Sequence, residues 1–216
     1  MSEGTRPRVL LADDHRLVAE GIKTLLEREF EIVGMAEDGL ALLDAAERLH
    51  PDVVVADITM PRLNGIDAIA RLRQIDDRIR IVLLTMHPEP MYVRRALDAG
   101  ASGYVLKHSS PEELVAAIRA ALAGRTYIEP TLVGELLHDS ARRPGDHVDP
   151  VASLTPRQRE ILQMVAEGRT AKEIGAALAI SARTVEFHKY QLMESLGLHT
   201  TADLVHFAIK HGIVSV

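Results

Sequence analysis

The sequence predicts two domains of different fold class: an α/β domain with a doubly wound parallel sheet of the (βα)5 type, then an all-α domain of four helices. Between about residues 8 and 124, five short apolar runs alternate with stretches of helical periodicity. Such alternation is typical of a parallel sheet with helices on both faces. From residue 153 only helical periodicity remains. We therefore expect domains over 1–127 and 151–216, joined by a linker over 128–150.

The predicted strands of the first domain are short and almost wholly apolar, as is expected where a sheet is covered on both faces. They lie at 9–11, 31–33, 53–55, 81–84 and 103–106. In the first predicted helix, Leu17, Ile22, Leu25 and Leu26 line the face expected to pack inward. The last helix, over 110–123, begins with Ser110-Pro111-Glu112-Glu113, which is a capping box with proline at the first helical position.

The segment after residue 124 changes character. One more short helix is predicted over 128–138, and the polar stretch from His138 to Pro150 contains two prolines and one glycine, which is typical of a linker. Capping boxes at Thr155–Gln158 and Thr170–Glu173 then begin two helices. A tight turn at 179–181 joins the second of these to a third helix, and this pair forms a helix-turn-helix arrangement. A fourth helix is predicted over 201–210.

Composition excludes several classes of protein. The 216 residues suit two small domains. No apolar run approaches the roughly 18 residues of a membrane span, and the first residues lack the features of a signal peptide, so we expect a soluble cytoplasmic protein without a membrane partner. There is no cysteine, and thus neither a disulfide nor a thiolate metal site.

The net charge of −6 is only weak evidence against a nucleic-acid partner, because the charge is unevenly distributed along the chain. Residues 151–216 hold 7 Lys and Arg against 6 Asp and Glu, so the acidity belongs to the first domain and the linker. With so few cations to neutralise phosphates, a single C-terminal domain should bind DNA weakly. Tight binding should therefore require a dimer.

Chemically useful side chains follow four of the predicted strands. Asp13 and Asp14 end the first strand, Asp57 the third, Thr85 the fourth and Lys107 the fifth. Because the carboxyl ends of parallel strands meet at one edge, these residues can form one pocket. Oxygen ligands without His or Cys suit Mg²⁺, and a carboxylate beside a metal, an ammonium and a hydroxyl suits phosphoryl transfer. Taken singly, Asp14 reads as a helix N-cap and Lys107 as a surface charge, but their joint placement favours the pocket.

The segments LLADDH, DITMPRLNG, LLTM and GYVLK resemble the receiver domain of bacterial two-component response regulators over residues 8–124. The resemblance implies that Asp57 accepts a phosphoryl group from a sensor histidine kinase. It implies a Mg²⁺ site made by Asp13, Asp14, Asp57 and the backbone carbonyl of Thr59. It also implies that Lys107 contacts the phosphoryl group, and that Thr85 and Tyr104 move together as a switch.

Two residues of this region have competing interpretations. Tyr104 could simply pack in the fifth strand instead of switching. His87 lies two residues after Thr85 and could tune the lifetime of the phosphoryl group, but an ordinary exposed loop histidine is the simpler interpretation.

Residues 153–214 resemble the LuxR-type (NarL/FixJ) four-helix DNA-binding domain through LTPRQREIL, GRTAKEIGAALAIS, RTVEFH and LMESLGL. A rotation of 100° per residue places Val185, Leu192 and Leu196 on the inner face of the third helix, with Phe187 and Tyr190 roughly opposite. Exposed aromatic residues indicate a contact surface. The predicted DNA contacts are Lys172, Arg183, Thr184, Glu186, Phe187, Lys189 and Tyr190.

Alternatives remain for these DNA contacts. Phe187 could pack on a neighbouring helix or subunit, and each cation alone could be a solvated surface charge. His188 lies nearer the inner face, where it could position the helix or serve as a core residue. In the fourth helix, Leu204, Phe207, Ala208 and Ile209 provide either a dimer contact, as the resemblance implies, or part of the core.

Together these observations predict a DNA-binding transcriptional response regulator that is not an enzyme. Phosphorylation of Asp57, with Mg²⁺, is expected to control homodimer formation and operator binding. One alternative is a DNA-binding regulator that works without phosphorylation. The other is a Mg²⁺-dependent aspartyl-phosphate phosphohydrolase, but the sequence offers neither a second carboxylate to activate water nor a substrate-binding cap.

Overall fold

The computed structural model describes residues 6–140 and 150–214. The first domain is built on one parallel sheet with the strand order β2-β1-β3-β4-β5-β6. Its strands are β1 (Arg8–Ala12), β2 (Glu31–Ala36), β3 (Val53–Ala56), β4 (Arg80–Thr85), β5 (Gly103–Leu106) and β6 (Tyr127–Ile128). The helices between them are α1 (Arg16–Leu26), α2 (Gly39–Leu49), α3 (Gly65–Ile75), α4 (Pro90–Ala99) and α5 (Pro111–Leu122).

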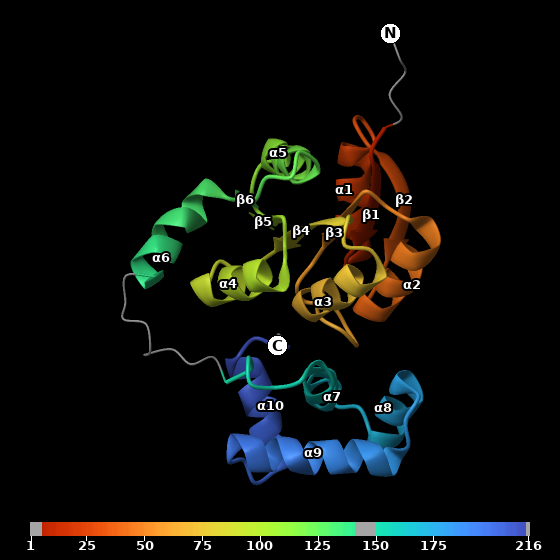
Figure 1. Cartoon of the computed structure of the whole chain (residues 1–216), viewed down its shortest axis with the longest axis vertical. Helices are drawn as coiled ribbons and strands as arrows, with labels where there is room; N and C mark the ends of the chain where they lie inside the picture. Colours follow the sequence, from red (N-terminus) through yellow and green to blue (C-terminus); the bar gives the residue numbers. More distant parts are fainter. Residues whose placement is uncertain (1–5, 141–149, 215–216) are drawn as a thin grey trace.

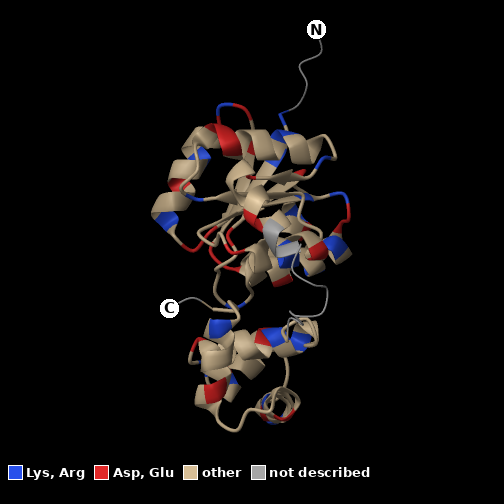
Figure 2. Cartoon of the chain, turned by 90° about the vertical axis from the view of Figure 1, so that its left-hand side faces the viewer, with Lys and Arg blue, Asp and Glu red and all other residues tan. Residues whose placement is uncertain are grey.

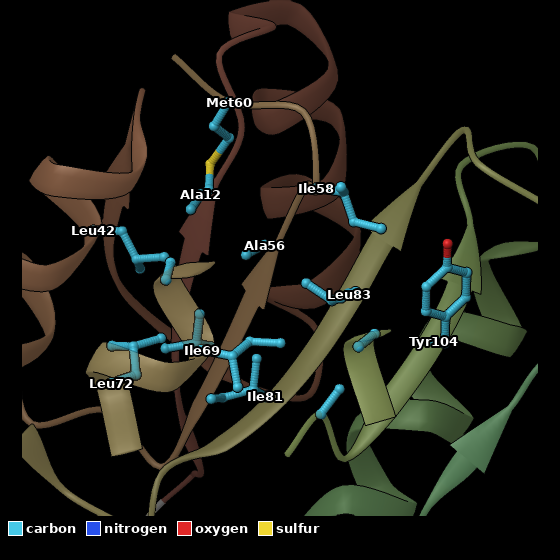
Figure 3. Close-up of a cluster of buried hydrophobic side chains, with 14 of the residues drawn as sticks. Ala12, Leu42, Ala56, Ile58, Met60, Ile69, Leu72, Ile81, Leu83 and Tyr104 are labelled. Atoms are coloured by element: carbon cyan, nitrogen blue, oxygen red, sulfur yellow. The ribbon is translucent and has the colours of Figure 1, made fainter. Parts of the chain in front are cut away.

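The helices cover the two faces of the sheet separately. Side chains of α2, α3 and α4 form one buried cluster with the strands, and side chains of α1 and α5 form another on the opposite face. In Figure 3, Leu42 of α2 and Ile69 of α3 point toward Ala56 and Leu83 of the central strands. These contacts confirm the doubly wound arrangement, because apolar strands need cover on both faces.

The sheet extends beyond the five predicted strands. β6 pairs in parallel with β5, and α6 (Pro130–Ser140) follows it and contacts α4. This helix occupies the region in which one more short helix was expected. The part of the predicted linker at 141–149 lies outside the described residues.

Two local predictions in the first domain are wrong. Leu17 is 89% exposed, because it lies about 180° around α1 from the buried Leu26 at 100° per residue. Ser110 precedes α5 but makes no side-chain capping bond. The carboxylate of Glu113, its expected partner in the capping box, instead accepts a hydrogen bond from the Tyr127 hydroxyl on the sixth strand.

The second domain has the four predicted helices: α7 (Pro156–Ala166), α8 (Ala171–Leu178), α9 (Ala182–Leu196) and α10 (Thr201–Lys210). The capping boxes predicted at Thr155 and Thr170 are both formed, and Thr200 begins α10 with a third. Val185 and Leu192 of α9 pack into a buried cluster with residues of the other three helices. No described helix is long and apolar enough to cross a membrane.

Candidate functional site

A cluster of charged side chains lies at the carboxyl end of the sheet. Asp13 follows β1, Asp57 follows β3 and Lys107 follows β5, and the side chains of all three are largely buried. The Lys107 ammonium nitrogen is 2.7 Å from Asp13 Oδ2 and 2.7 Å from Asp57 Oδ2. The parallel topology thus brings together residues up to 94 positions apart, as the sequence predicted.

The same cluster has the donor set of a cation site. Ligand atoms of Asp13, Asp14, His15 and Asp57 all lie within 4.8 Å of one another. Asp57 Oδ1 is buried and has no hydrogen-bond partner within the described structure, and an unpaired buried carboxylate oxygen is costly. Burial raises the pKa of Asp57, Lys107 opposes that rise and Asp13 adds to it. A cation placed here would satisfy the free oxygen and relieve the repulsion between the carboxylates.

His15 was not singled out from the sequence. Its ring Nδ1 is 2.9 Å from Asp14 Oδ1, and its backbone N–H donates to Asp13 Oδ1 at 2.9 Å. It therefore orients the acidic pair. Asp14 makes no side-chain capping bond to α1, because the N-cap position is taken by His15, which makes none either.

The residues predicted to switch surround the β4–α4 loop. Thr85 is fully buried, and its Oγ1 accepts from the His87 backbone N–H at 3.3 Å. Tyr104 is also fully buried, and its hydroxyl donates to the His87 carbonyl at 2.7 Å; burial raises the pKa of Tyr104 far above its usual range. Figure 3 shows the Tyr104 ring on β5, with the hydroxyl directed to the end of the sheet.

His87 is not the exposed loop residue that the simpler interpretation expected. It is half-buried and stacks on Tyr92 of α4 with a centroid distance of 4.2 Å. Its Nε2 lies 2.9 Å from the hydroxyl oxygen of Thr59, in the loop after Asp57. His87 therefore connects the loop after the central carboxylate with the first turn of α4. In the sequence, the position of His87 near Thr85 was its only signal.

The second candidate surface is the outer face of α9. Phe187 is 57% exposed and Tyr190 is 62% exposed, so the described helices leave most of the Phe187 side chain uncovered. Arg183 and Lys172, at the starts of α9 and α8, are exposed as well. Lys189 Nζ lies 3.6 Å from Glu186 Oε2.

The inner residues of α9 also follow the prediction. Val185 and Leu192 are fully buried. Leu196 is partly buried and packs against the same core. His188 is half-buried, and its Nδ1 is buried without a partner in the described structure. Along α10, Leu204 and Ala208 belong to the core, whereas Ile209 is partly exposed.

Comparisons with known proteins identify both halves of the chain. Residues 9–119 match the family model of the response regulator receiver domain, and residues 152–208 match that of the LuxR family of bacterial regulatory proteins.

The chain belongs to the two-component response regulators with a LuxR-type DNA-binding domain. It is therefore a DNA-binding transcription regulator and not an enzyme.

Relatives span both domains of this response regulator. It is 39% identical to the transcriptional regulatory protein MctR of Rhizobium johnstonii, over all of this chain and 99% of that protein. It is 35% identical to the response regulator GacA of Pseudomonas aeruginosa, over 96% of this chain and 97% of that one. A solved structure of RcsB from Salmonella enterica, bound to a promoter with the phosphomimetic BeF₃⁻, matches with TM-score 0.61 and 30% identity, over 94% of this chain and 98% of that one.

The receiver and the LuxR-type domain meet through α7, which lies against α3 and the loop before it (Figure 1). Gln163 of α7 is 1% exposed. Its Nε2 donates to the Met60 carbonyl at 2.8 Å, and its Oε1 accepts from the Asn64 backbone N–H at 2.8 Å. Gly65 holds this loop close to the sheet, because a Cβ there would lie 2.1 Å from the Asp57 carbonyl oxygen. One side chain thus bridges the DNA-binding domain to the loop that follows Asp57.

Ion pairs surround that bridge. Glu160 of α7 is 1% exposed and pairs with Arg71 of the receiver and with Arg157 of its own helix. Arg159 pairs with the buried Asp67 of α3. The sequence did not predict these contacts, because each residue alone reads as part of a solvated helix surface.

The end of α10 forms a second contact with the receiver. Arg95 of α4 donates to the His211 carbonyl at 2.7 Å. A Cβ on Gly212 would lie 1.6 Å from the Tyr92 hydroxyl, so this ring sits directly against the glycine backbone. By contrast, α9 lies on the side of its domain away from the receiver (Figure 1). Lys and Arg are interspersed with Asp and Glu over the DNA-binding domain (Figure 2).

Proposed function

We propose that Asp57 accepts a phosphoryl group from a sensor histidine kinase. The observation that carries this proposal is the asymmetry of its carboxylate: Oδ2 is held by Lys107, whereas the buried Oδ1 has no partner in the described structure. A carboxylate oxygen would attack phosphorus, the P–N bond to the kinase histidine would break, and the ring nitrogen would leave with the electron pair. Lys107 would then move from carboxylate to phosphoryl oxygen as charge develops there.

We propose Mg²⁺ as the cation of this pocket, held by Asp13, Asp14, Asp57 and the backbone carbonyl of Thr59. Hard oxygen ligands with few protein carboxylates favour Mg²⁺, which keeps waters that a phosphoryl oxygen can replace. When bound, the ion supplies positive charge to the phosphoryl oxygens. The buried, unpartnered oxygen of Asp57 supports this fit.

The outer face of α9 is proposed to enter the major groove of operator DNA. Phe187 would contact a thymine methyl group and Glu186 would accept from a cytosine amino group, while Arg183, Thr184, Lys189 and Tyr190 reach along the strand. Lys172 would contact a phosphate from the start of α8. Because cations are few, we propose that tight binding requires a homodimer formed in part by α10. The similar structure of two RcsB dimers bound to two parallel DNAs supports the dimer.

Coupling between the domains is proposed to run through the loop after Asp57. Phosphorylation adds about 1.5 to 2 negative charges beside a loop whose Met60 and Asn64 are bound to Gln163 of α7. Thr85 and Tyr104 would rearrange with the β4–α4 loop, which leads into α4, and α4 carries the contact of Tyr92 and Arg95 with the end of α10. Both contacts would then loosen and free the DNA-binding domain to dimerise. As a regulator of transcription, the protein is proposed to act in the cytoplasm.

The test is selection of operator DNA from a random pool by the full-length protein, with and without acetyl phosphate and Mg²⁺. We expect phosphorylation at Asp57, seen by intact mass, and about tenfold tighter binding to the selected DNA, equivalent to ~1.4 kcal/mol. Asp57→Asn should abolish both effects and keep the basal affinity. Phosphodonor-dependent binding in Asp57→Asn would contradict the proposed switch. Unphosphorylated wild-type protein that binds tightly would favour a regulator that works without phosphorylation.

A further inference from the structure

Glu129 is a buried carboxylate that lies outside the pocket described above. It stands between β6 and α6, ten residues beyond the match to the receiver model, and it is 6% exposed. Acidic side chains are almost never this buried unless they are paired. The groups that Glu129 binds therefore indicate what it does.

Both ends of one turn are bound by this carboxylate. Glu129 Oε2 accepts from the Leu106 backbone N–H at 2.8 Å and from the Ser109 hydroxyl at 2.5 Å. The Ser109 N–H also donates to the Leu106 carbonyl at 3.0 Å, which closes the turn from 106 to 109. Lys107 lies inside this turn. Glu129 thus holds the Leu106 backbone before Lys107 and the Ser109 side chain after it.

The shortness of β6 explains why a side chain is needed here. β6 pairs with β5 over two residues, and the Glu129 N–H then donates to the Tyr104 carbonyl at 3.1 Å. The chain next turns into α6, so the following edge donor, Leu106 N–H, faces no strand residue. The Glu129 carboxylate supplies the acceptor that a longer strand would have provided. Without it, a buried N–H would lose its partner.

The charge state of Glu129 agrees with this geometry. Burial alone raises the pKa of Glu129. Hydrogen bonds from Ser109, Leu106 and Thr131 outweigh that effect and leave the pKa below its usual value. Glu129 is therefore an ionised acceptor at neutral pH, with hydrogen bonds of the stronger, charge-assisted kind.

We propose that Glu129 is a positioning residue for phosphoryl transfer, acting through Lys107. By fixing the turn 106–109, it sets where the Lys107 ammonium meets Asp13 and Asp57, both at 2.7 Å. Small displacements of such a group cost large factors in rate. This inference rests on the proposed phosphorylation of Asp57 for one of its two measurements and is independent of it for the other.

Three variants of the full-length chain isolate this role. Glu129→Ser retains a hydroxyl that can cap α6 but is too short to reach Leu106 and Ser109. Glu129→Gln retains an acceptor oxygen at full length. Thr131→Val is the matched control, because Thr131 is exposed and its hydroxyl donates to the other carboxylate oxygen, Glu129 Oε1, at 3.0 Å.

The first measurement is the rate of phosphorylation by acetyl phosphate at saturating Mg²⁺. Glu129→Ser should be slower by about tenfold, whereas Glu129→Gln and Thr131→Val stay within about twofold of wild type. In a Lys107→Ala background, Glu129→Ser should produce no further slowing. Further slowing in that background, or equal rates in Glu129→Ser and wild type, would overturn the proposal.

The second measurement is the affinity for Mg²⁺ alone, by calorimetry. A loosened Lys107 competes less for Asp13 and Asp57, so Glu129→Ser should bind Mg²⁺ more tightly, by about threefold. Opposite changes in rate and Mg²⁺ affinity support positioning, whereas a joint loss of both indicates general destabilisation and overturns it. Wild-type protein that acetyl phosphate does not label would contradict the proposed function, and the Mg²⁺ measurement would then decide the role of Glu129.

Discussion

Two buried polar clusters lie on either side of the loop from 58 to 64, and they are satisfied differently. In the phosphorylation pocket, Asp13 and Asp57 share one lysine, and Asp57 Oδ1 has no partner within the described residues. At the domain interface, the Gln163 amide both donates and accepts, and Glu160 is held by two arginines. The pocket is therefore incomplete without further positive charge, whereas the interface is complete in this arrangement.

This difference gives the two clusters different roles. The phosphorylation pocket is suited to bind a cation or a phosphoryl group, whereas the interface is suited to hold the two domains together. An unsatisfied buried carboxylate gains free energy when a cation or phosphoryl group arrives. A satisfied buried network loses free energy when it is pulled apart, because each separated group keeps its desolvation cost unless water replaces the partner. A regulator needs both clusters, because the free energy gained in the phosphorylation pocket must offset the free energy lost when the domain interface opens.

The largest expected effect follows from weakening the cation site of the phosphorylation pocket. Asp13→Asn, or removal of Mg²⁺ by EDTA, should slow phosphorylation by about 100-fold, because a directly placed carboxylate and its cation are lost. Labelling by acetyl phosphate, followed by intact mass, measures the rate. Asp52→Asn is the control, since the Asp52 carboxylate accepts from the Arg8 backbone N–H at the start of β1, at the opposite end of the strands from the pocket. Wild-type rates in Asp13→Asn would show that the cluster gathers no cation.

A substitution in the satisfied cluster at the domain interface should change how firmly the two domains are held together. Gln163→Ala removes the bonds to Met60 and Asn64 and leaves both backbone groups unpaired in the closed arrangement, at a cost of about 2–3 kcal/mol. The domains should then separate, with a larger radius of gyration in small-angle X-ray scattering of unphosphorylated protein. Gln74→Ala, exposed on α3 of the receiver side, should leave the scattering unchanged. An unchanged radius in Gln163→Ala would mean that the interface does not depend on this bridge.

The sequence predicted the phosphorylation pocket but not the domain interface. The pocket was predictable because strand ends in a parallel sheet converge, so Asp57 and Lys107 needed only the correct strand assignment. The partners of Gln163 were not, because their meeting depends on how two domains dock, and helical periodicity shows only that a polar residue can face outward. The half-buried His87 and the buried Glu129 were misread or missed for the same reason. Each is fixed by contacts from distant segments and not by local pattern.

The second interdomain contact gives a smaller expected effect. Gly212 has φ +64° and Gly197 has φ +65°, so alanine at either position carries the same backbone strain, about 1 kcal/mol. Only Gly212→Ala also places a Cβ against Tyr92, since nothing lies within 4 Å of a Cβ at Gly197. We expect Gly212→Ala to increase the rate of proteolysis at the domain junction by severalfold more than Gly197→Ala, because opening raises the cleavable population. Equal rates in the two variants would assign the effect to backbone strain alone.

The smallest effect concerns a carboxylate that is satisfied within the receiver itself. Glu129 has a pKa below the ordinary value of 4.5 because its hydrogen bonds outweigh burial. A carboxyl group with a lowered folded-state pKa contributes stability that is present above its unfolded pKa and lost as pH falls through the folded one. The free energy of unfolding of wild type minus that of Glu129→Gln, from urea titrations, should therefore be constant from pH 7 to about 5 and decrease below about 4.5. Asp57, whose pKa burial raises, is common to both proteins and cancels in this difference. If this difference in the free energy of unfolding increased below pH 4.5, the ionised Glu129 carboxylate would be destabilising in the folded protein. Glu129 would then resemble the unsatisfied carboxylates of the phosphorylation pocket and not the satisfied groups of the domain interface.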